Sequence, residues 1–178
     1  LIEKENLGGT CLNWGCIPTK ALLKSAELFE EFKHAKSYGL KAENVEANFV
    51  EIIKRSRKVA QINSKGVEFL MKKNKIDVIK GSAQLKKAGL VEVDDGSKKS
   101  EIKANHIIIA TGGRPRSIPD IEIDGSTVLS SKEAMSLEKQ PESLIIMGAG
   151  AIGVEFAYFY NSIGTKVTLV EMLDSVLP

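Results

Sequence analysis

The sequence predicts an α/β fold with parallel sheets and a small antiparallel insertion, and three observations support this prediction. An apolar run at 144–147 leads into a glycine-rich turn and then a helical pattern, which is the order of a strand, turn and helix unit. A second apolar run at 106–110 also ends in glycines and is typical of a strand buried on both faces of a parallel sheet. Alternation with a period of two at 76–103 predicts the insertion.

Periodicity and capping predict the elements at the start of the chain. Residues 1–4 have the composition of a strand end, and a helix is expected over 19–36. Its buried stripe recurs every three or four residues, at Leu22, Leu23, Ala26, Phe29 and Phe32. Asn48 is an expected N-cap, so a second helix is predicted from there to about residue 73. The expected core face of that helix is Val59, Ile62, Val67 and Leu70.

Short strands with turns between them are predicted in the middle of the chain. The expected strands lie near 76–79, 84–85, 90–93 and 101–103, with a turn at 94–97. Turn-forming residues dominate 114–125, and a domain boundary is placed at residue 117. This gives two domains, 1–117 and 118–178. A short helix after Ser130 and strands at 144–147 and 166–170 complete the prediction.

The glycine run Gly148-Ala149-Gly150-Ala151-Ile152-Gly153 lies between the strand at 144–147 and a helical stripe. This context distinguishes a dinucleotide-binding turn from a chance glycine pattern. Gly148 permits the tight turn, Gly150 lets the backbone approach a pyrophosphate, and Gly153 allows close packing of helix and strand. Glu171 follows about 20 residues later, where a carboxylate binds a ribose and repels a 2′-phosphate. The pattern therefore predicts NAD rather than NADP.

Cys11 and Cys16 are the only cysteines, and both lie in a run of small residues. A bridge between them would close a loop too short to stabilise the fold much through the unfolded chain. If the run opens a helix, the pair stands about 7.5 Å apart along the axis at about 1.5 Å per residue. That exceeds the roughly 7 Å limit for bridging without distortion, so such a disulfide is expected to be easily reduced.

The cysteine spacing alone leaves three interpretations open. Two inert buried thiols are the ordinary state of intracellular cysteines. A structural zinc site is less favoured, because it requires four ligands and neither His34 nor His106 lies beside the cysteine pair in the sequence. The third interpretation is a redox couple, in which a helix N-terminus lowers the pKa of one thiol.

The neighbouring residues favour the redox couple. Residues 8–18 match the active-site signature of the class I pyridine nucleotide-disulfide oxidoreductases, and the chain resembles that family over nearly its whole length. Within the family, Leu12 with Asn13 and residues 17–23 resemble the dihydrolipoamide dehydrogenases most, while glutathione and mercuric reductases carry close variants. Trp14 departs from the pattern, since many members have a smaller residue there.

This resemblance implies roles for individual residues. Cys11 would attack the substrate disulfide, and Cys16 would exchange electrons with a flavin. Lys20 would lie near the flavin ring and pair with Glu155. The resemblance implies FAD-binding residues at Glu3, Gly8, Gly9, Thr10, Cys11, Lys20, Ala83, Thr111, Gly112 and Gly113. It implies NAD-binding residues at Gly148, Gly150, Ala151, Ile152, Gly153 and Glu171.

The resemblance also implies two Rossmann-like domains, for FAD over 1–117 and for NAD over 118–178, both incomplete. The family has a glycine-rich turn about 20 residues before the position of Glu3, and this chain has no residues there. The rest of the NAD domain and a dimerisation domain carrying a histidine base would follow residue 178. The chain is therefore expected to be an internal fragment that is inactive by itself.

The activity implied for the parent protein is oxidation of protein-bound dihydrolipoyl groups through Cys11, Cys16 and FAD, with reduction of NAD+. The implied partners are a lipoyl-bearing protein of a 2-oxoacid dehydrogenase or glycine cleavage system, and a second copy in a homodimer. Alternatives are a related NAD(P)H-dependent disulfide or mercuric reductase, or an inactive nucleotide-binding fragment. Glu171 and Leu12 favour the first activity over the related reductases.

Composition and charge limit the classes of partner. The chain is 43% hydrophobic and 27% charged, which is ordinary for a globular protein. A net charge of +2 gives no electrostatic reason to expect nucleic acid. No apolar run approaches the eighteen or so residues that span a bilayer, and no targeting segment is recognisable. A redox cysteine pair suits a reducing compartment, so the expected location is the cytoplasm, or the mitochondrial matrix in a eukaryote.

Overall fold

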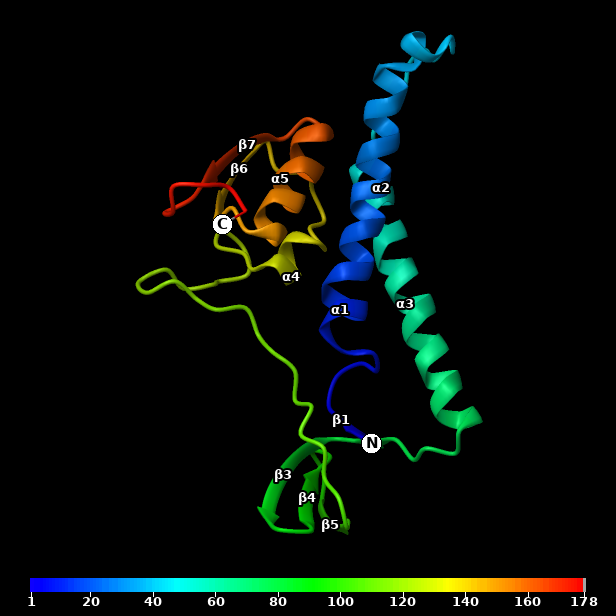
Figure 1. Ribbon diagram of the computed structural model, residues 1–178, viewed down its shortest axis with the longest axis vertical. Coiled ribbons are helices and arrows are strands. Elements are labelled where there is room, and N and C mark those ends of the chain that lie inside the picture. The colour runs from blue at the N-terminus through cyan, green and yellow to red at the C-terminus, as the bar shows by residue number, and fades with distance from the viewer. Residues whose placement is uncertain (178) are drawn as a thin grey trace.

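A computed structural model describes residues 1–177. Figure 1 shows a pair of long helices, α2 (Cys16–Lys33) and α3 (Phe49–Lys73), with an α/β unit beside their upper part and a small sheet near the chain's N-terminus. Short helix α1 (Gly9–Trp14) precedes α2, and the 3-10 turn η1 (Ala35–Tyr38) follows it. Helix α2 packs against both α3 and α5 (Ala151–Ser162), so it joins the two parts of the molecule.

Local backbone geometry sets the ends of the long helices. Helix α2 begins at Cys16, three residues before the predicted start, because Gly15 breaks the chain direction at φ −140° and ψ −119°. It also ends at Lys33 rather than residue 36. The predicted cap of α3 is confirmed, since Asn48 Oδ1 accepts a hydrogen bond from the Glu51 backbone N–H at 3.1 Å.

The core face predicted for α3 is wrong. The buried residues of this helix are Phe49, Ile53, Ser56 and Ala60, whereas Ile62 and Leu70 are exposed. A 25-residue helix is about 37 Å long at 1.5 Å per residue. Only its N-terminal half lies against the helices that form the core, so the apolar residues of its second half remain at the surface (Figure 1).

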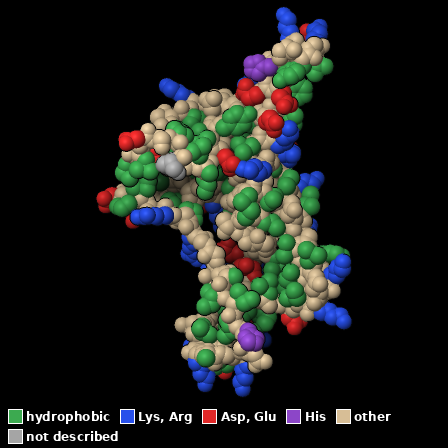
Figure 2. Space-filling model, viewed as in Figure 1, with side chains coloured by type: hydrophobic (Ala, Val, Ile, Leu, Met, Phe, Trp, Pro, Cys, Tyr) green, Lys and Arg blue, Asp and Glu red, His purple; other side chains and the backbone are tan. Residues whose placement is uncertain are grey.

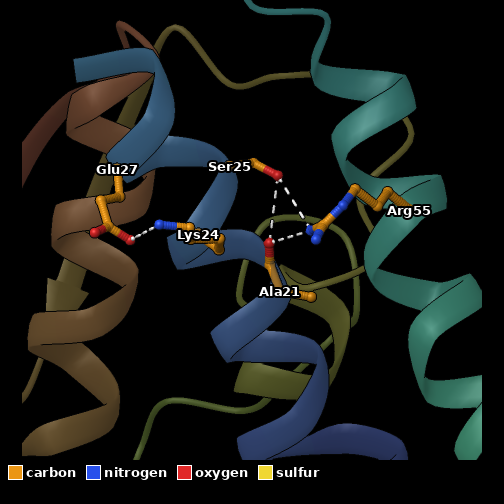
Figure 3. A network of polar contacts seen from close by, with 5 residues as sticks. All are labelled: Ala21, Lys24, Ser25, Glu27 and Arg55. Carbon is orange, nitrogen blue, oxygen red and sulfur yellow. Dashed lines mark hydrogen bonds and ion pairs between the residues drawn. The ribbon is translucent and has the colours of Figure 1, made fainter. Parts of the chain in front are cut away.

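Polar contacts hold α3 against α2 at the helix backbone. Figure 3 shows Arg55 reaching from α3 to α2, where its Nη1 donates to the Ala21 carbonyl at 2.7 Å and to Ser25 Oγ at 3.4 Å. Ser56 Oγ donates to the Pro18 carbonyl at 2.9 Å in a buried site. Proline at position 18 also leaves no N–H to satisfy in the first turn of α2.

The sheets confirm the predicted α/β fold with its antiparallel insertion. Strand β1 (Ile2–Glu3) pairs in parallel with β2 (Ile79–Lys80), and β6 (Ser143–Met147) pairs in parallel with β7 (Lys166–Val170). The insertion is an antiparallel sheet of three strands in sequence order: β3 (Ser82–Lys87), β4 (Leu90–Asp94) and β5 (Lys99–Lys103). The predicted turn between the last two is present, with the Gly96 N–H donating to Asp94 Oδ1 at 2.9 Å.

The strand predicted at residues 106–110 is wrong. No strand forms over 106–110, and Ile108 is 91% exposed. An apolar run becomes a strand only when a neighbour completes its ladder of hydrogen bonds, and no other segment within residues 1–177 pairs with this one. Figure 2 shows hydrophobic side chains exposed over much of the visible face of the molecule.

One hydrophobic core joins residues from both sides of position 117. Leu22 and Phe49 from α2 and α3 lie in the same cluster as Met135, Phe159 and Tyr160. Met135 ends the short helix α4 (Ser131–Ala134), whose predicted start is confirmed by a capping box between Ser130 and Glu133. The predicted domain boundary itself stays a prediction. Within the described part of the chain, no helix is long and apolar enough to cross a membrane.

Candidate functional site

Cys11 and Cys16 form a disulfide at the junction of α1 and α2. Their Cα atoms are 4.7 Å apart, which is within the usual range for bridged cysteines. The expected axial separation of about 7.5 Å is wrong, because it assumed one continuous helix. Gly15 ends α1 and turns the chain between the two cysteines, and a Cβ at this position would lie 3.1 Å from Cys11 Cα. Glycine therefore permits the close approach of the cysteines.

Hydrogen bonds hold the turn that precedes Cys11. Gly8 has φ +103°, a conformation that side-chain-bearing residues rarely adopt, and a Cβ there would lie 2.6 Å from Leu12 Cδ1. Asn13 is buried, and its Nδ2 donates to the carbonyls of Leu7 at 2.9 Å and Gly9 at 3.0 Å. The glycine turn and α1 therefore form one braced unit that presents exposed Thr10 and Cys11 at the surface.

Lys20 and Glu155 form an ion pair between α2 and α5, although 135 positions separate them in the chain. Lys20 lies one turn after Cys16, and Glu155 lies two residues after Gly153 of the glycine turn. The Glu155 side chain is more enclosed than that of Lys20, at 29% and 62% exposure. The pair therefore places the N-terminal part of α2, which begins at Cys16, beside α5, which follows the predicted NAD turn.

The glycine turn after β6 has the geometry that the motif predicts. Gly148 has φ +105°. A Cβ on Gly153 would overlap the Gly148 carbonyl oxygen and lie 3.4 Å from Ile146 Cγ2. Gly153 therefore lets α5 start directly against the strand. Gly150, the N-cap of α5, has open space where a Cβ would be. Ala151 and Ile152 follow it in the first turn of α5, and both are exposed.

Glu171 at the end of β7 is tied to this turn. Its Oε2 accepts a hydrogen bond from the Ala149 N–H at 2.7 Å, and its Oε1 accepts from Met172 at 2.7 Å and Leu173 at 2.9 Å. The N–H groups of Leu173, Ala149 and Met172 hold the pKa of the Glu171 carboxyl below its usual value. An ionised carboxylate therefore stands beside the space over Gly150.

Glu3 occupies the corresponding position at the end of β1. Its Oε1 accepts the N–H of Glu5 at 2.8 Å. A groove of about 420 Å³ opens beside it, and its lining includes Glu3, Asn6, Leu7, Glu68, Lys72 and Ile76. The two acidic residues predicted to bind riboses thus each end a parallel strand, as the rule for open α/β sheets requires.

Comparisons with known proteins agree with this geometry. The family model of pyridine nucleotide-disulphide oxidoreductases matches residues 1–178. The chain belongs to this family. It is 48% identical over 180 residues to a dihydrolipoyl dehydrogenase of Chlorobaculum parvum, covering 100% of this chain and 38% of that protein. It is 41% identical over 187 residues to a dihydrolipoyl dehydrogenase of Bacillus subtilis, covering 100% and 40%.

Solved structures of the family have the same fold. The HOCl-induced flavoprotein disulfide reductase RclA from Escherichia coli matches 100% of this chain and 37% of its own, with a TM-score of 0.80 and 31% identity. LpdA from Mycobacterium tuberculosis matches 99% and 39%, with a TM-score of 0.89 and 27% identity. The chain thus spans about two fifths of the length of the relatives it matches.

FAD and NAD are the cofactors of this family, and the residues present fit them. The open space over Gly150, the first N–H groups of α5 and the Glu171 carboxylate suit a pyrophosphate and an adjoining ribose. The positive-φ turn at Gly8 and Gly9 and the groove beside Glu3 suit the second nucleotide. NAD would lie at the first of these sites and FAD at the second.

The structure does not bring every predicted FAD residue to the Glu3 groove. Ala83 lies in the exposed strand β3, opposite Val93 of β4. Thr111, Gly112 and Gly113 lie in an exposed stretch that carries no helix or strand. Their roles toward FAD stay predictions.

The zinc interpretation of the cysteine pair needs a cluster of ligand side chains, which residues 1–177 do not provide. Over residues 1–177, no three histidine, cysteine, aspartate or glutamate side chains stand close enough together to hold a metal ion. The two histidines, purple in Figure 2, lie at opposite ends of the visible face. Both sulfurs are joined in the disulfide.

The surroundings of Trp14 were not predicted from the sequence. The guanidinium of Arg57, from α3, lies 4.1 Å from the centre of the indole, and Lys132 Nζ, from α4, lies 4.6 Å from it. The unusual tryptophan was visible in the sequence, but its two cationic neighbours come from positions 43 and 118 residues away.

Proposed function

We propose that the whole protein is a dihydrolipoyl dehydrogenase, which oxidises protein-bound dihydrolipoyl groups and reduces NAD+ with FAD as its second cofactor. One observation carries the proposal: the Lys20–Glu155 ion pair joins the helix that begins at the redox disulfide to the helix that begins at the NAD turn. Identities of 41–48% to proteins named dihydrolipoyl dehydrogenase support the same activity.

The chemistry of the cysteine pair is thiol–disulfide exchange. One thiol of a dihydrolipoyl group attacks Cys11 Sγ, which breaks the Cys11–Cys16 bond, releases the Cys16 thiol and leaves a mixed disulfide. The second thiol then attacks the lipoyl sulfur of that mixed disulfide and releases the Cys11 thiol. The products are a lipoyl disulfide and two protein thiols, so two electrons and two protons pass to the pair. Cys11 and Cys16 are both exposed, which leaves the bridge accessible to a substrate thiol.

The other residues bind, orient and carry charge. FAD, when bound, supplies the two-electron chemistry between the thiols and NAD+. Lys20 provides a positive charge one turn from Cys16, and Glu155 limits the positions that the ammonium group can take. Glu171 would accept hydrogen bonds from the ribose of NAD and disfavour a 2′-phosphate.

We extend the proposal to partners and location. A lipoyl-bearing protein of a 2-oxoacid dehydrogenase or glycine cleavage system would supply the substrate, and the whole protein would act as a homodimer. The support is membership of the family and the similarity to dihydrolipoyl dehydrogenases. A cytoplasmic location, or the mitochondrial matrix in a eukaryote, is supported by the use of both cysteines in one redox bridge.

The test is anaerobic reduction of the purified full-length protein by dihydrolipoamide, followed by visible absorption. The expected result is a bound flavin, a long-wavelength band from a thiolate beside it, and then formation of NADH on addition of NAD+. A Cys11→Ser variant should show none of the dithiol-dependent changes. Protein that binds flavin but does not respond to dihydrolipoamide would contradict the proposal and favour a related disulfide reductase.

A further inference from the structure

Trp14 lies at the end of α1, and two cationic side chains lie close to its indole ring. Arg57 approaches its indole from α3 and Lys132 approaches from α4, with distances to the ring centre of 4.1 and 4.6 Å. The indole is partly buried and packs against the hydrophobic core. Three separate elements therefore meet at one side chain, and the attraction of cations to an aromatic face favours this arrangement.

Arg57 also holds the end of α1 directly. Its Nη2 donates to the Asn13 carbonyl at 2.8 Å, and its Nη1 lies 3.7 Å from Met135 Sδ. A cation at the carbonyl end of a helix satisfies groups that the helix leaves unpaired. None of the ion pairs among residues 1–177 includes Arg57 or Lys132.

Trp14 lies between the two cysteines in the chain. Trp14 is followed by Gly15, where the backbone turns, and then by Cys16. Cys11 precedes it within the same short helix. A six-residue helix has little stability of its own, so its direction relative to α2 depends on tertiary contacts. Contacts at Trp14 therefore bear on the direction of α1 relative to α2.

We propose that Trp14, Arg57 and Lys132 form a clamp that positions Cys11 against Cys16 by fixing the junction of α1 and α2. These are positioning residues, since they act through the backbone of the junction. The inference deepens the proposed function and rests on its redox role for the disulfide. With the clamp intact, the two thiols of the reduced protein stay close together, which raises their effective concentration and favours the disulfide.

The sign of the expected effect separates positioning from a direct influence of charge. If the clamp is loosened, the thiols drift apart and the equilibrium moves toward the dithiol. If the two cations instead acted on the sulfurs through space, their removal would destabilise a thiolate and move the equilibrium toward the disulfide. Trp14→Leu changes no charge, so it reports on position alone.

The experiment equilibrates full-length holoprotein with mixtures of reduced and oxidised dithiothreitol, traps free thiols by alkylation, and measures the peptide that carries both cysteines by mass. Trp14→Leu is expected to shift the equilibrium about tenfold toward the dithiol, equivalent to about 30 mV for a two-electron couple. Trp14→Phe keeps an aromatic face and should stay within about threefold of the wild type. Lys132→Met removes one of the two cations near the indole and should shift the equilibrium in the same direction as Trp14→Leu.

Lys33 provides a matched control. Its Nζ also lies over an aromatic ring, 4.4 Å from the centre of the Phe29 ring. It also joins α2 to α5, because its Nζ donates to the Ser162 carbonyl at 2.9 Å. Lys33 is 17 residues after Cys16 on α2, so the two residues are about 25 Å apart along the helix axis at 1.5 Å per residue. Lys33→Met should therefore leave the disulfide equilibrium unchanged.

Two outcomes would overturn the clamp. One is that Trp14→Leu and Lys132→Met both have the same dithiol–disulfide equilibrium as the wild type. The other is that Lys132→Met moves the equilibrium toward the disulfide. If Trp14→Leu does not fold, Lys132→Met decides the question alone. Because dithiothreitol replaces the lipoyl substrate and no NAD+ is added, this result is independent of whether the protein oxidises dihydrolipoamide.

Discussion

Replacing Gly153 by alanine tests whether the glycine turn is set by close packing. A Cβ at this position would overlap the Gly148 carbonyl oxygen and lie 3.1 Å from the carbonyl carbon and 3.4 Å from Ile146 Cγ2, so α5 must move away from β6. Alanine in place of glycine in a helix stabilises by roughly 0.5–1 kcal/mol, whereas overpacking typically costs about 1–3 kcal/mol. The obstacle here is backbone, which favours the upper end. With an overpacking cost of about 3 kcal/mol, the expected net effect is about 2–2.5 kcal/mol of destabilisation.

Gly66 in α3 is the matched control for this prediction. It is exposed, and a Cβ there would meet nothing within 4 Å. Gly66→Ala should therefore stabilise the protein by roughly 0.5–1 kcal/mol through helix propensity alone. Urea unfolding of the full-length wild type and both variants gives the order of their midpoints. A Gly153→Ala midpoint equal to or above that of the wild type would refute the packing argument.

Three further predictions follow from single contacts. Gly150→Ala should unfold like the wild type, because the added Cβ enters open space. The same variant should weaken NAD binding at least about tenfold in a fluorescence titration, because the Cβ occupies the proposed pyrophosphate site. An unchanged affinity for NAD would contradict that site. Glu171 has a lowered pKa in the folded protein, so its contribution to stability is complete above the ordinary value of 4.5 and is lost as pH falls below it. The stability difference between the wild type and Glu171→Gln should therefore shrink between about pH 5 and pH 3, and a constant difference across that range of thermal melts would show that its hydrogen bonds do not favour the charged form. Asn48→Ala removes the cap of α3 and should cost about 1 kcal/mol in urea unfolding, while Asn63→Ala, away from the helix ends, should cost less.

Features that depend on a few neighbouring residues were predictable. The Asn48 cap, the turn at Asp94 to Ser97, the capping box at Ser130 and the end of α5 at Gly164 all follow from local chemistry. At Gly164 the chain has φ +102°, and the following N–H of Thr165 donates back to the Tyr160 carbonyl at 3.0 Å. Such contacts form within one turn, so the residue types that make them are adjacent in the sequence.

Features that depend on a distant partner were predicted poorly. Residues 106–110 have the composition of a buried strand, but a strand needs a neighbour, and none within residues 1–177 pairs with it. The buried face of α3 was misplaced because Phe49 and Ala60 are buried by helices that the periodicity of α3 does not specify. The Lys20–Glu155 pair was expected only from the family resemblance.

The sequence by itself determined the chemistry of this protein: a cysteine pair beside a glycine turn, and a second glycine turn followed by an acidic residue. These motifs work through backbone conformations that glycine alone permits, so they are readable without the fold. Only the tertiary structure decided how they are arranged. It joined the disulfide helix to the nucleotide helix through Lys20 and Glu155, and placed Arg57 and Lys132 around Trp14. Packing of the shared core brings these distant residues together, and no local pattern encodes that contact.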